Sequence, residues 1–180
     1  MRWDTLEKEK RKTTALQAFQ ERRTMQMRLL LAVDGSEASD AAVDEVARRA
    51  LPEGSEIEIV SVYESPYAML AEPWMSAEVD YDVIEKAERE RARRVVEDAA
   101  AKLRAGPVSQ QSKITTKVLK GQPKRAIVEE AEAFGADLIV IGSHGRGSVE
   151  RFLLGSVSQA VAMHAPCSVE IVRRRKARRN

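Results

Sequence analysis

The 180-residue sequence contains one cysteine, Cys167, and no apolar run near the ~18 residues that a membrane-spanning helix needs. A lone cysteine excludes an intramolecular disulfide bond and is typical of proteins from a reducing compartment. The N-terminal stretch MRWDTLEKEKRK is charged throughout and no hydrophobic segment follows it, so a signal peptide is not expected. We therefore expect a globular protein of the cytoplasm.

Motifs that define several classes of enzyme and metal site are also missing. The sequence has no G-x-x-x-x-G-K-[ST] loop, and no G-x-G-x-x-G follows the first predicted strand. The pyrophosphatase-type SGGxD and adenylyltransferase HxGH signatures are absent as well. Two histidines, His144 and His164, occur without clustered cysteines, so no metal site is expected. No catalytic residue is predicted.

Charge is unevenly distributed along the chain. Residues 1–28 carry eight basic and four acidic side chains, and the stretch RRRKARRN (173–180) carries six basic and no acidic ones. The intervening part is acidic, with 16 basic and 24 acidic residues. Three interpretations of the basic tail stand: a solvated disordered segment, contact with the acidic body, or weak binding to a polyanion such as nucleic acid or an anionic membrane.

Strand-like and helix-like segments alternate from residue 28 onward. Short apolar runs predict five strands, at 28–34, 56–64, 113–119, 137–142 and 168–172. Helical spacing of apolar residues predicts four intervening helices. The first has Ser36 or Ser39 as its N-cap, and the third begins near Pro123 and ends at Gly135. The second spans about 79–104, with these residues facing inward: Ile84, Ala87, Val95, Ala99 and Leu103.

This alternation predicts an α/β fold with an open parallel sheet and helices on both faces, because parallel strands are joined by right-handed helical crossovers. Sheets of this kind bind ligands beyond the carboxyl ends of their strands. Two segments carry suitable residues at such ends, VDGS (33–36) and IGSHGRG (141–147).

The stretch GSHGRGSVERFLLGSVS (142–158) is rich in glycine. Gly142 lacks a Cβ and would let a ligand approach the backbone, and Gly145 lets the loop turn with its amides inward. Gly155 and Ser156 would open the fourth helix, whose N-terminal amides attract phosphate. The hydroxyl groups of Ser156 and Ser158 would donate further hydrogen bonds. The pattern by itself is also typical of a plain turn between strand and helix.

The same stretch resembles the universal stress protein family, whose ATP-binding branch carries G-x2-G-x9-G-[ST]. Gly142, Gly145, Gly155 and Ser156 match every defined position of that motif. LLLAVDGSEAS is similar to the family's first strand, and GQPKRAIVEEAEAFGADLIVIG to its third helix and fourth strand. HAPCSVEIV resembles its final segment, except that Ser168 stands where proline is usual. The resemblance covers about 27–172.

The resemblance implies a Rossmann-like five-stranded sheet of order 3-2-1-4-5 and a regulatory protein of the stress response that binds ATP, with Mg²⁺ accompanying the nucleotide. The residues that match contacts to adenine, ribose and phosphates in the family are Ala32, Val33, Asp34, Val62, Ile141, Gly142, Gly145, Gly155, Ser156, Val157 and Ser158. Two alternatives stay open: a slow ATPase on the same fold, and an interaction module that binds no nucleotide.

Two polar residues in these segments have two interpretations each. Asp34 either caps the GSEAS turn or hydrogen-bonds to the nucleotide. Arg146, between two glycines, either pairs with phosphate or is solvated.

The chain divides into an extension (1–26), a nucleotide-binding domain (27–172) and the basic tail. Apolar residues at helical spacing, from Trp3 to Phe19, predict an amphipathic helix in the extension, and a wrongly chosen start codon is the alternative. The last strand, 168–172, would be an edge strand, and we expect a homodimer that pairs two copies of it. Glu170 opposes that pairing unless an arginine such as Arg173 neutralises it. A further protein partner is expected, and the sequence does not identify it.

Overall fold

The computed structural model describes residues 26–65, 80–145 and 154–173. The helix predicted in the N-terminal extension and the basic tail beyond Arg173 lie outside these ranges. All five predicted strands and four predicted helices are present, and a short 3-10 helix is added. The elements are β1 (Arg28–Ala32), α2 (Glu37–Ala47), β2 (Ser55–Tyr63), α3 (Tyr81–Ala105), η2 (Pro107–Gln110), β3 (Ser112–Lys120), α4 (Pro123–Phe134), β4 (Leu138–Gly142), α5 (Ser156–His164) and β5 (Ser168–Val172).

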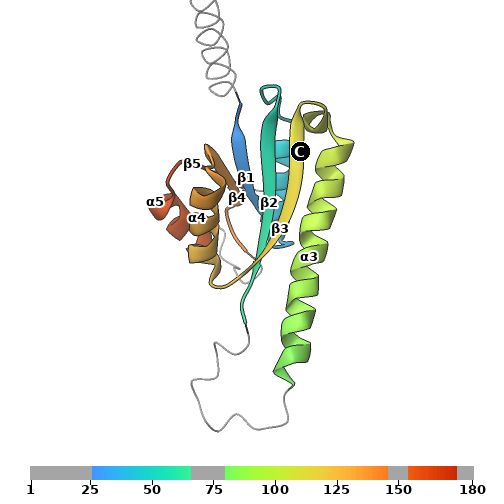
Figure 1. Ribbon diagram of the computed structural model, residues 1–180. Helices are drawn as coiled ribbons and strands as arrows, with labels where there is room; N and C mark the ends of the chain where they lie inside the picture. The colour runs from blue at the N-terminus through green and yellow to red at the C-terminus, as the bar shows by residue number, and fades with distance from the viewer. Residues whose placement is uncertain (1–25, 66–79, 146–153, 174–180) are drawn as a thin grey trace, which may run out of the picture.

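The five strands form one parallel sheet in the order β3-β2-β1-β4-β5, which confirms the predicted fold class. Helices α2 and α3 pack on one face, and α4 and α5 pack on the other (Figure 1). The change of direction falls between β1 and β4, since β1 leads outward to β2 and β3 whereas β4 leads to β5 on the opposite side. Open α/β sheets in general bind ligands at this position, which is called the β1–β4 crevice below.

Strand β1 forms the centre of two hydrophobic cores, one on each face. Leu29 and Leu31 pack against α2 and α3, and Leu30 packs against α4 and α5. All three side chains have no exposed surface. Complete burial of successive residues is what a sheet with both faces covered requires, and it explains why this strand is a continuous apolar run.

Turn chemistry sets the helix boundaries as predicted. The hydroxyl oxygen of Ser36 accepts a hydrogen bond from the Ser39 amide, so Ser36 is the N-cap of α2. Pro123 occupies the first turn of α4, where its missing N–H is of no consequence. Gly135 ends α4 in the left-handed conformation, with φ of 67°.

The predicted inward face of α3 is wrong in its first half. Ile84 is 40% exposed and Ala87 is also exposed, whereas the core contacts come from the second half of the helix. With 25 residues, α3 is about 37 Å long, and the nine-residue strand β3 spans only about 30 Å. The helix therefore extends past the carboxyl edge of the sheet (Figure 1). The residues that it buries are Ala92, Val96, Ala99, Ala100 and Leu103.

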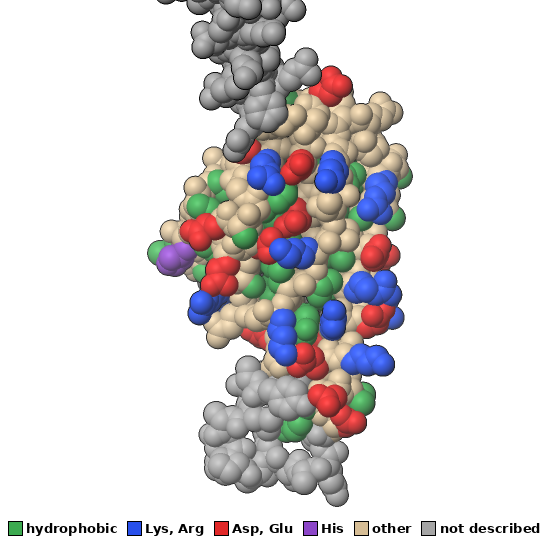
Figure 2. Space-filling model, in the orientation of Figure 1, with side chains coloured by type: hydrophobic (Ala, Val, Ile, Leu, Met, Phe, Trp, Pro, Cys, Tyr) green, Lys and Arg blue, Asp and Glu red, His purple; other side chains and the backbone are tan. Residues whose placement is uncertain are grey.

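The described helices cover the α4 side of the sheet incompletely. Helix α4 contacts β1 and β2, and β3 lies beside it with its outer surface open (Figure 1). Figure 2 shows acidic and basic side chains intermingled over this part of the sheet. Lys117, on β3, is among the exposed residues there.

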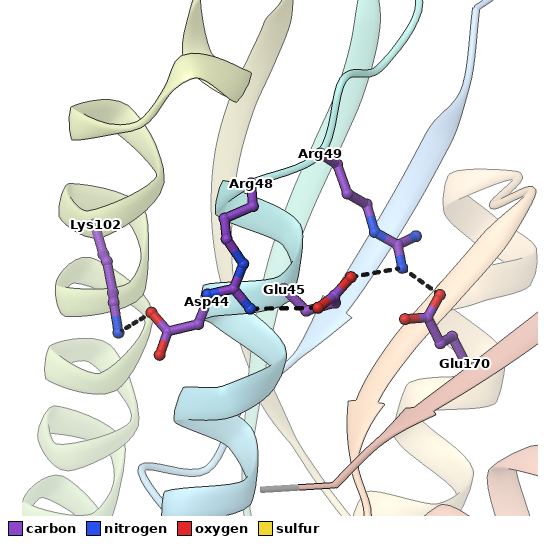
Figure 3. Close-up of polar contacts among 6 residues, drawn as sticks. All are labelled: Asp44, Glu45, Arg48, Arg49, Lys102 and Glu170. Atoms are coloured by element: carbon purple, nitrogen blue, oxygen red, sulfur yellow. Dashed lines mark hydrogen bonds and ion pairs between the residues drawn. The ribbon is translucent and has the colours of Figure 1, made fainter. Parts of the chain in front are cut away.

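An ion-pair network joins α2 to the edge strand β5 (Figure 3). The guanidinium of Arg49 contacts the carboxylate of Glu170 and lies 3.8 Å from that of Glu45. The expectation was that an arginine such as Arg173 neutralises Glu170, and within the chain the arginine that does so is Arg49. Within the described residues, β5 pairs with β4 alone, so its other edge is available to a second strand.

Candidate functional site

Three chain segments meet at the carboxyl edge of the sheet between β1 and β4: the turn after β1, the loop after β4 and the start of α5. The amide of Gly155 donates a 2.8 Å hydrogen bond to the carbonyl of Ser143. The hydroxyl of Ser36 donates to the carbonyl of His144 across 3.2 Å. The residues of the two glycine-bearing motifs, far apart in sequence, therefore surround one point of the sheet.

The turn after β1 is organised by Asp34. Its Oδ1 accepts a hydrogen bond from the Ser36 amide at 3.0 Å, and Gly35 has a left-handed φ of 76°. The turn-capping interpretation of Asp34 is confirmed. The other carboxylate oxygen, Oδ2, faces the β4 loop, because a Cβ placed on Gly145 would lie 2.9 Å from it. Asp34 thus has one oxygen on its own turn and one directed at the predicted phosphate loop.

The structure gives a different reason for glycine at 142 from the one expected. A Cβ at Gly142 would lie 2.6 Å from the carbonyl carbon of Ala38 and 2.7 Å from the nitrogen of Ser39. These backbone atoms belong to the first turn of α2. The expectation that this glycine makes room for a ligand is wrong, because the space is filled by the helix that packs on β4.

The start of α5 differs from that of α2 in its capping. Its N-cap is Gly155, and no side chain of the described residues bonds to its first amides. Helix α2, by contrast, is capped by Ser36. Gly155 is closely packed as well, because an added Cβ would lie 3.2 Å from the Ser143 carbonyl oxygen and 3.3 Å from the Cα of His144. The first turn of α5 therefore directs backbone amides, rather than a capping side chain, toward the loop after β4.

The two serines of α5 have different environments. Ser156 is exposed, whereas Ser158 is only 2% exposed. The hydroxyl of Ser158 lies 3.0 Å from the carbonyl oxygen of Ser143 and 2.9 Å from that of Gly155. Because a hydroxyl has one hydrogen to donate, the expected hydrogen bond from this side chain to a phosphate is not supported. Ser158 instead fixes the β4 loop to the helix.

The apolar residues predicted for the site form its base. Ala32 and Ile141 are paired neighbours on β1 and β4, and both are buried beneath the crevice. The amide of Val33 bonds to the carbonyl of Val60, and Val62 lies two residues further along β2. The half-buried Val157 packs on the same face as Val62. Arg146 lies outside the described residues.

Two residues of the site were not predicted. Ser143 joins the loop to α5 through its carbonyl oxygen, and its Oγ lies 2.9 Å from Nδ1 of His144. Nε2 of His144 is buried and has no hydrogen-bond partner among the described residues. In the sequence, Ser143 and His144 stand at the unspecified positions of the glycine motif, so no motif signal marks them.

The fold and this site together define a Rossmann-like α/β domain with a glycine-bearing crevice at the switch point of the sheet. Residues 25–173 match the sequence profile of the Universal stress protein family, and the chain belongs to that family. It is 35% identical over 145 residues to a universal stress protein encoded in the QAH/OAS sulfhydrylase 3' region of Thermus aquaticus, covering 81% of this chain and 97% of that one.

Solved structures with the same fold include the hypothetical protein MJ0577, with a TM-score of 0.71 and 24% identity over 85% of this chain and 99% of that one. A universal stress protein solved in complex with cAMP superposes with a TM-score of 0.57 and 25% identity, over 82% of this chain and 97% of that one. None of the helices in the described ranges is both long and apolar enough to cross a membrane.

Proposed function

We propose that this universal stress protein binds ATP in the crevice between β1 and β4 and acts as a nucleotide-dependent regulator. The observation that carries the proposal is the start of α5, where uncapped amides adjoin the loop after β4. A helix N-terminus of this kind stabilises phosphate by hydrogen bonding and by its dipole. The carboxylate oxygen of Asp34 that faces Gly145 adds a hydrogen-bond acceptor for a ribose hydroxyl.

The predicted residues divide into two groups around the nucleotide. Ala32, Val33 and Val62 would contact the adenine and the ribose. The phosphates would be bound by backbone amides rather than by hydroxyl groups, since the hydroxyl of Ser158 is engaged by the protein's own carbonyls. Mg²⁺ would be held mainly by phosphate oxygens and water. The groups that adjoin the ribose and phosphates are Asp34, Ile141, Gly142, Gly145, Arg146, Gly155, Ser156, Val157 and Ser158.

A solved relative supports the choice of an adenine nucleotide. The universal stress protein in complex with cAMP shares the fold over 97% of its length. Adenine and ribose are common to cAMP and ATP, so a shared base and sugar subsite is the simplest inference. The preference for three phosphates over one rests on the glycine motif of this chain.

The test is calorimetric titration of the full-length protein with ATP, AMP, cAMP and GTP. We expect ATP to bind most tightly, and the Gly155→Val variant to lose ATP binding while Ala162→Val, on the exposed side of the same helix, keeps it. A folded protein that binds no adenine nucleotide at millimolar concentration would refute the proposal. Equal affinity for AMP, cAMP and ATP would refute the proposed phosphate site but not the adenine and ribose subsite.

We further propose that the protein is not an enzyme. A general base or electrophile positioned beside the γ-phosphate is needed for efficient transfer. Asp34 is a poor candidate for the base, because in the proposed complex its Oδ2 accepts a hydrogen bond from the ribose rather than facing the γ-phosphate, and its Oδ1 is bound to the Ser36 amide. The slow ATPase is the alternative, and a turnover measurement separates the two.

The proposed assembly is a homodimer through β5. Among the described residues, no strand pairs with its outer edge, so the backbone groups there can pair with a second copy. The contact of Arg49 with Glu170 reduces the like-charge repulsion between two copies of this strand. Light scattering at micromolar concentration tests this proposal, since a monomer there would contradict it.

A further inference from the structure

A cluster of charged side chains fastens α4 to the sheet, away from the β1–β4 crevice. Glu58 on β2 stands opposite Thr115 on β3, two residues before Lys117, so it lies on the same face of the sheet as Lys117 and beside Glu130 of α4. Lys117 on β3 lies with its Nζ 2.7 Å from Oε1 of Glu130. Glu130 is only 8% exposed, and Oε2 of Glu58 is buried without a hydrogen-bond partner among the described residues.

Two carboxyl groups bond to each other only when one of them carries a proton. Burial is the largest cause that raises the pKa of Glu58, to about 7, and the hydrogen bond to Glu130 and the charge of Glu130 raise it further. Lys117 and Arg28 act in the opposite direction. The ammonium of Lys117 is shared with Glu130, and this contact raises the pKa of Lys117. One positive charge therefore serves two buried acids.

The other groups around Glu58 do not supply a positive charge that could take the place of the shared proton. Nη2 of Arg28, on β1, lies 3.2 Å from Oε2 of Glu56. The Cζ atom of the same guanidinium lies over the ring of Phe134 on α4, 4.5 Å from the ring centroid. The guanidinium is thus engaged on both sides. Opposite Glu58 on β3 stands Thr115, whose hydroxyl donates to the carbonyl of Ile57. Opposite it on β1 stands the apolar Leu30.

We propose that Glu58 and Glu130 form a proton-dependent latch, which holds α4 on the sheet while the two carboxyl groups share a proton and weakens when that proton is lost. In the protonated state, Glu58 is the neutral donor, and Glu130 is paired with Lys117. In the deprotonated state, two buried carboxylates face each other across the contact between β2 and α4. Repulsion then favours conformations in which α4 moves outward and both groups reach water.

The sign of the pH dependence follows from the raised pKa. The pKa of Glu58 is about 7 in the folded chain, and it returns to the ordinary value of 4.5 when α4 opens. Between these two pH values, the folded chain holds a proton on Glu58 that the opened chain releases. Opening of α4 therefore becomes easier as the pH rises through this window and is constant above it. From pH 6.0 to 8.5 these two pKa values predict an increase of about tenfold in the opening equilibrium.

The direct test is a carboxyl-carbon NMR titration of the full-length protein, labelled at glutamate and free of nucleotide. We expect one glutamate to titrate near pH 7, and its signal to be absent from the Glu58→Gln variant. The Lys117→Met variant should move that titration to higher pH, because it removes the neighbouring positive charge. Titration of every glutamate below pH 5.5 in the wild-type protein overturns the proposal, whether or not the variants fold.

Hydrogen exchange in α4 tests the mechanical part. After correction for intrinsic exchange rates, amide protection in α4 should fall about tenfold from pH 6.0 to 8.5 in the wild-type protein and stay constant in Glu58→Gln. Glu129→Gln, beside Glu130 on the exposed side of α4, is the matched control and should behave as wild type. Protection that is independent of pH in the wild type, or an unchanged pH dependence in Glu58→Gln, would overturn the latch. Neither measurement depends on nucleotide binding.

Discussion

Replacing Gly142 by alanine tests the packing of α2 against β4. The new Cβ would lie 2.6 Å from the carbonyl carbon of Ala38, whereas an ordinary contact begins at 3.4 Å. The first turn of α2 must therefore move outward by about 0.8 Å, because backbone atoms cannot rotate away as a side chain does. Over-packing of a core usually costs about 1–3 kcal/mol, and we expect the upper end of that range.

The assay is thermal unfolding followed by circular dichroism. A loss of about 3 kcal/mol in a chain of this size corresponds to a fall of roughly 6–12 °C in the unfolding temperature. The loss has a structural source, because α2 buries Ala42, Val43 and Val46 on the sheet, and lifting its first turn loosens these contacts. An unfolding temperature within about 1 °C of wild type would refute the packing account of Gly142.

Gly145→Ala is the matched control in the same loop. Among the described residues its Cβ would meet only the Oδ2 atom of Asp34, at 2.9 Å, and a carboxylate can rotate away. We expect a stability loss below about 1 kcal/mol, with an effect on ATP affinity that exceeds the effect on stability. Equal destabilisation by the two variants would show that the loop, rather than the helix contact, is sensitive to added volume.

Four further predictions follow from the site and its surroundings. Gly155→Val should abolish ATP binding and also lower stability slightly, because its Cβ lies 3.2 Å from the Ser143 carbonyl; normal affinity by calorimetry would place the phosphates elsewhere. Arg49→Ala should weaken the dimer about fivefold in sedimentation equilibrium, since it leaves Glu170 unpaired, whereas Arg48→Ala, which contacts Glu45 alone among the described residues, should not. ATP turnover should stay well below about one per second in a phosphate-release assay, and a faster rate would reverse the non-enzyme proposal. A chain ending at Val172 should bind ATP as the full-length protein does; equal binding of the two chains to DNA, RNA and anionic vesicles at low salt would exclude a polyanion role for the tail.

The sheet could be predicted from sequence because its strands are short apolar runs with helices between them, and the core buries those runs almost completely. The first half of α3 could not. Ile84 and Ala87 have the helical spacing of a buried face, and nothing local indicates that the helix outruns the sheet. Exposure there depends on the relative lengths of α3 and β3, which is a property of their packing.

The sequence predicted which segments meet at the candidate site, but it predicted the structural roles of the individual residues only in part. The glycines and Asp34 indicate a turn, a loop and a helix start, but the reason for Gly142 depends on how closely α2 approaches β4. The carboxyl pair was invisible for a similar reason. Glu58 occupies a polar position in an alternating strand, and Glu130 lies in a charged helix, so only the docking of α4 on β2 brings the two together.

Helix α2 has a mechanical consequence that its sequence does not suggest. Its first residue is preceded by Ser36, which is bonded to the loop after β4, and just past its last turn stands Arg49, which is bonded to the edge strand. These two attachments lie at opposite ends of an 11-residue rod about 16 Å long. A displacement of the loop by a ligand would tilt this rod as a lever, and its far end would move the charge that adjoins the β5 edge. The proposed nucleotide site and the proposed β5 interface therefore adjoin opposite ends of one stiff element.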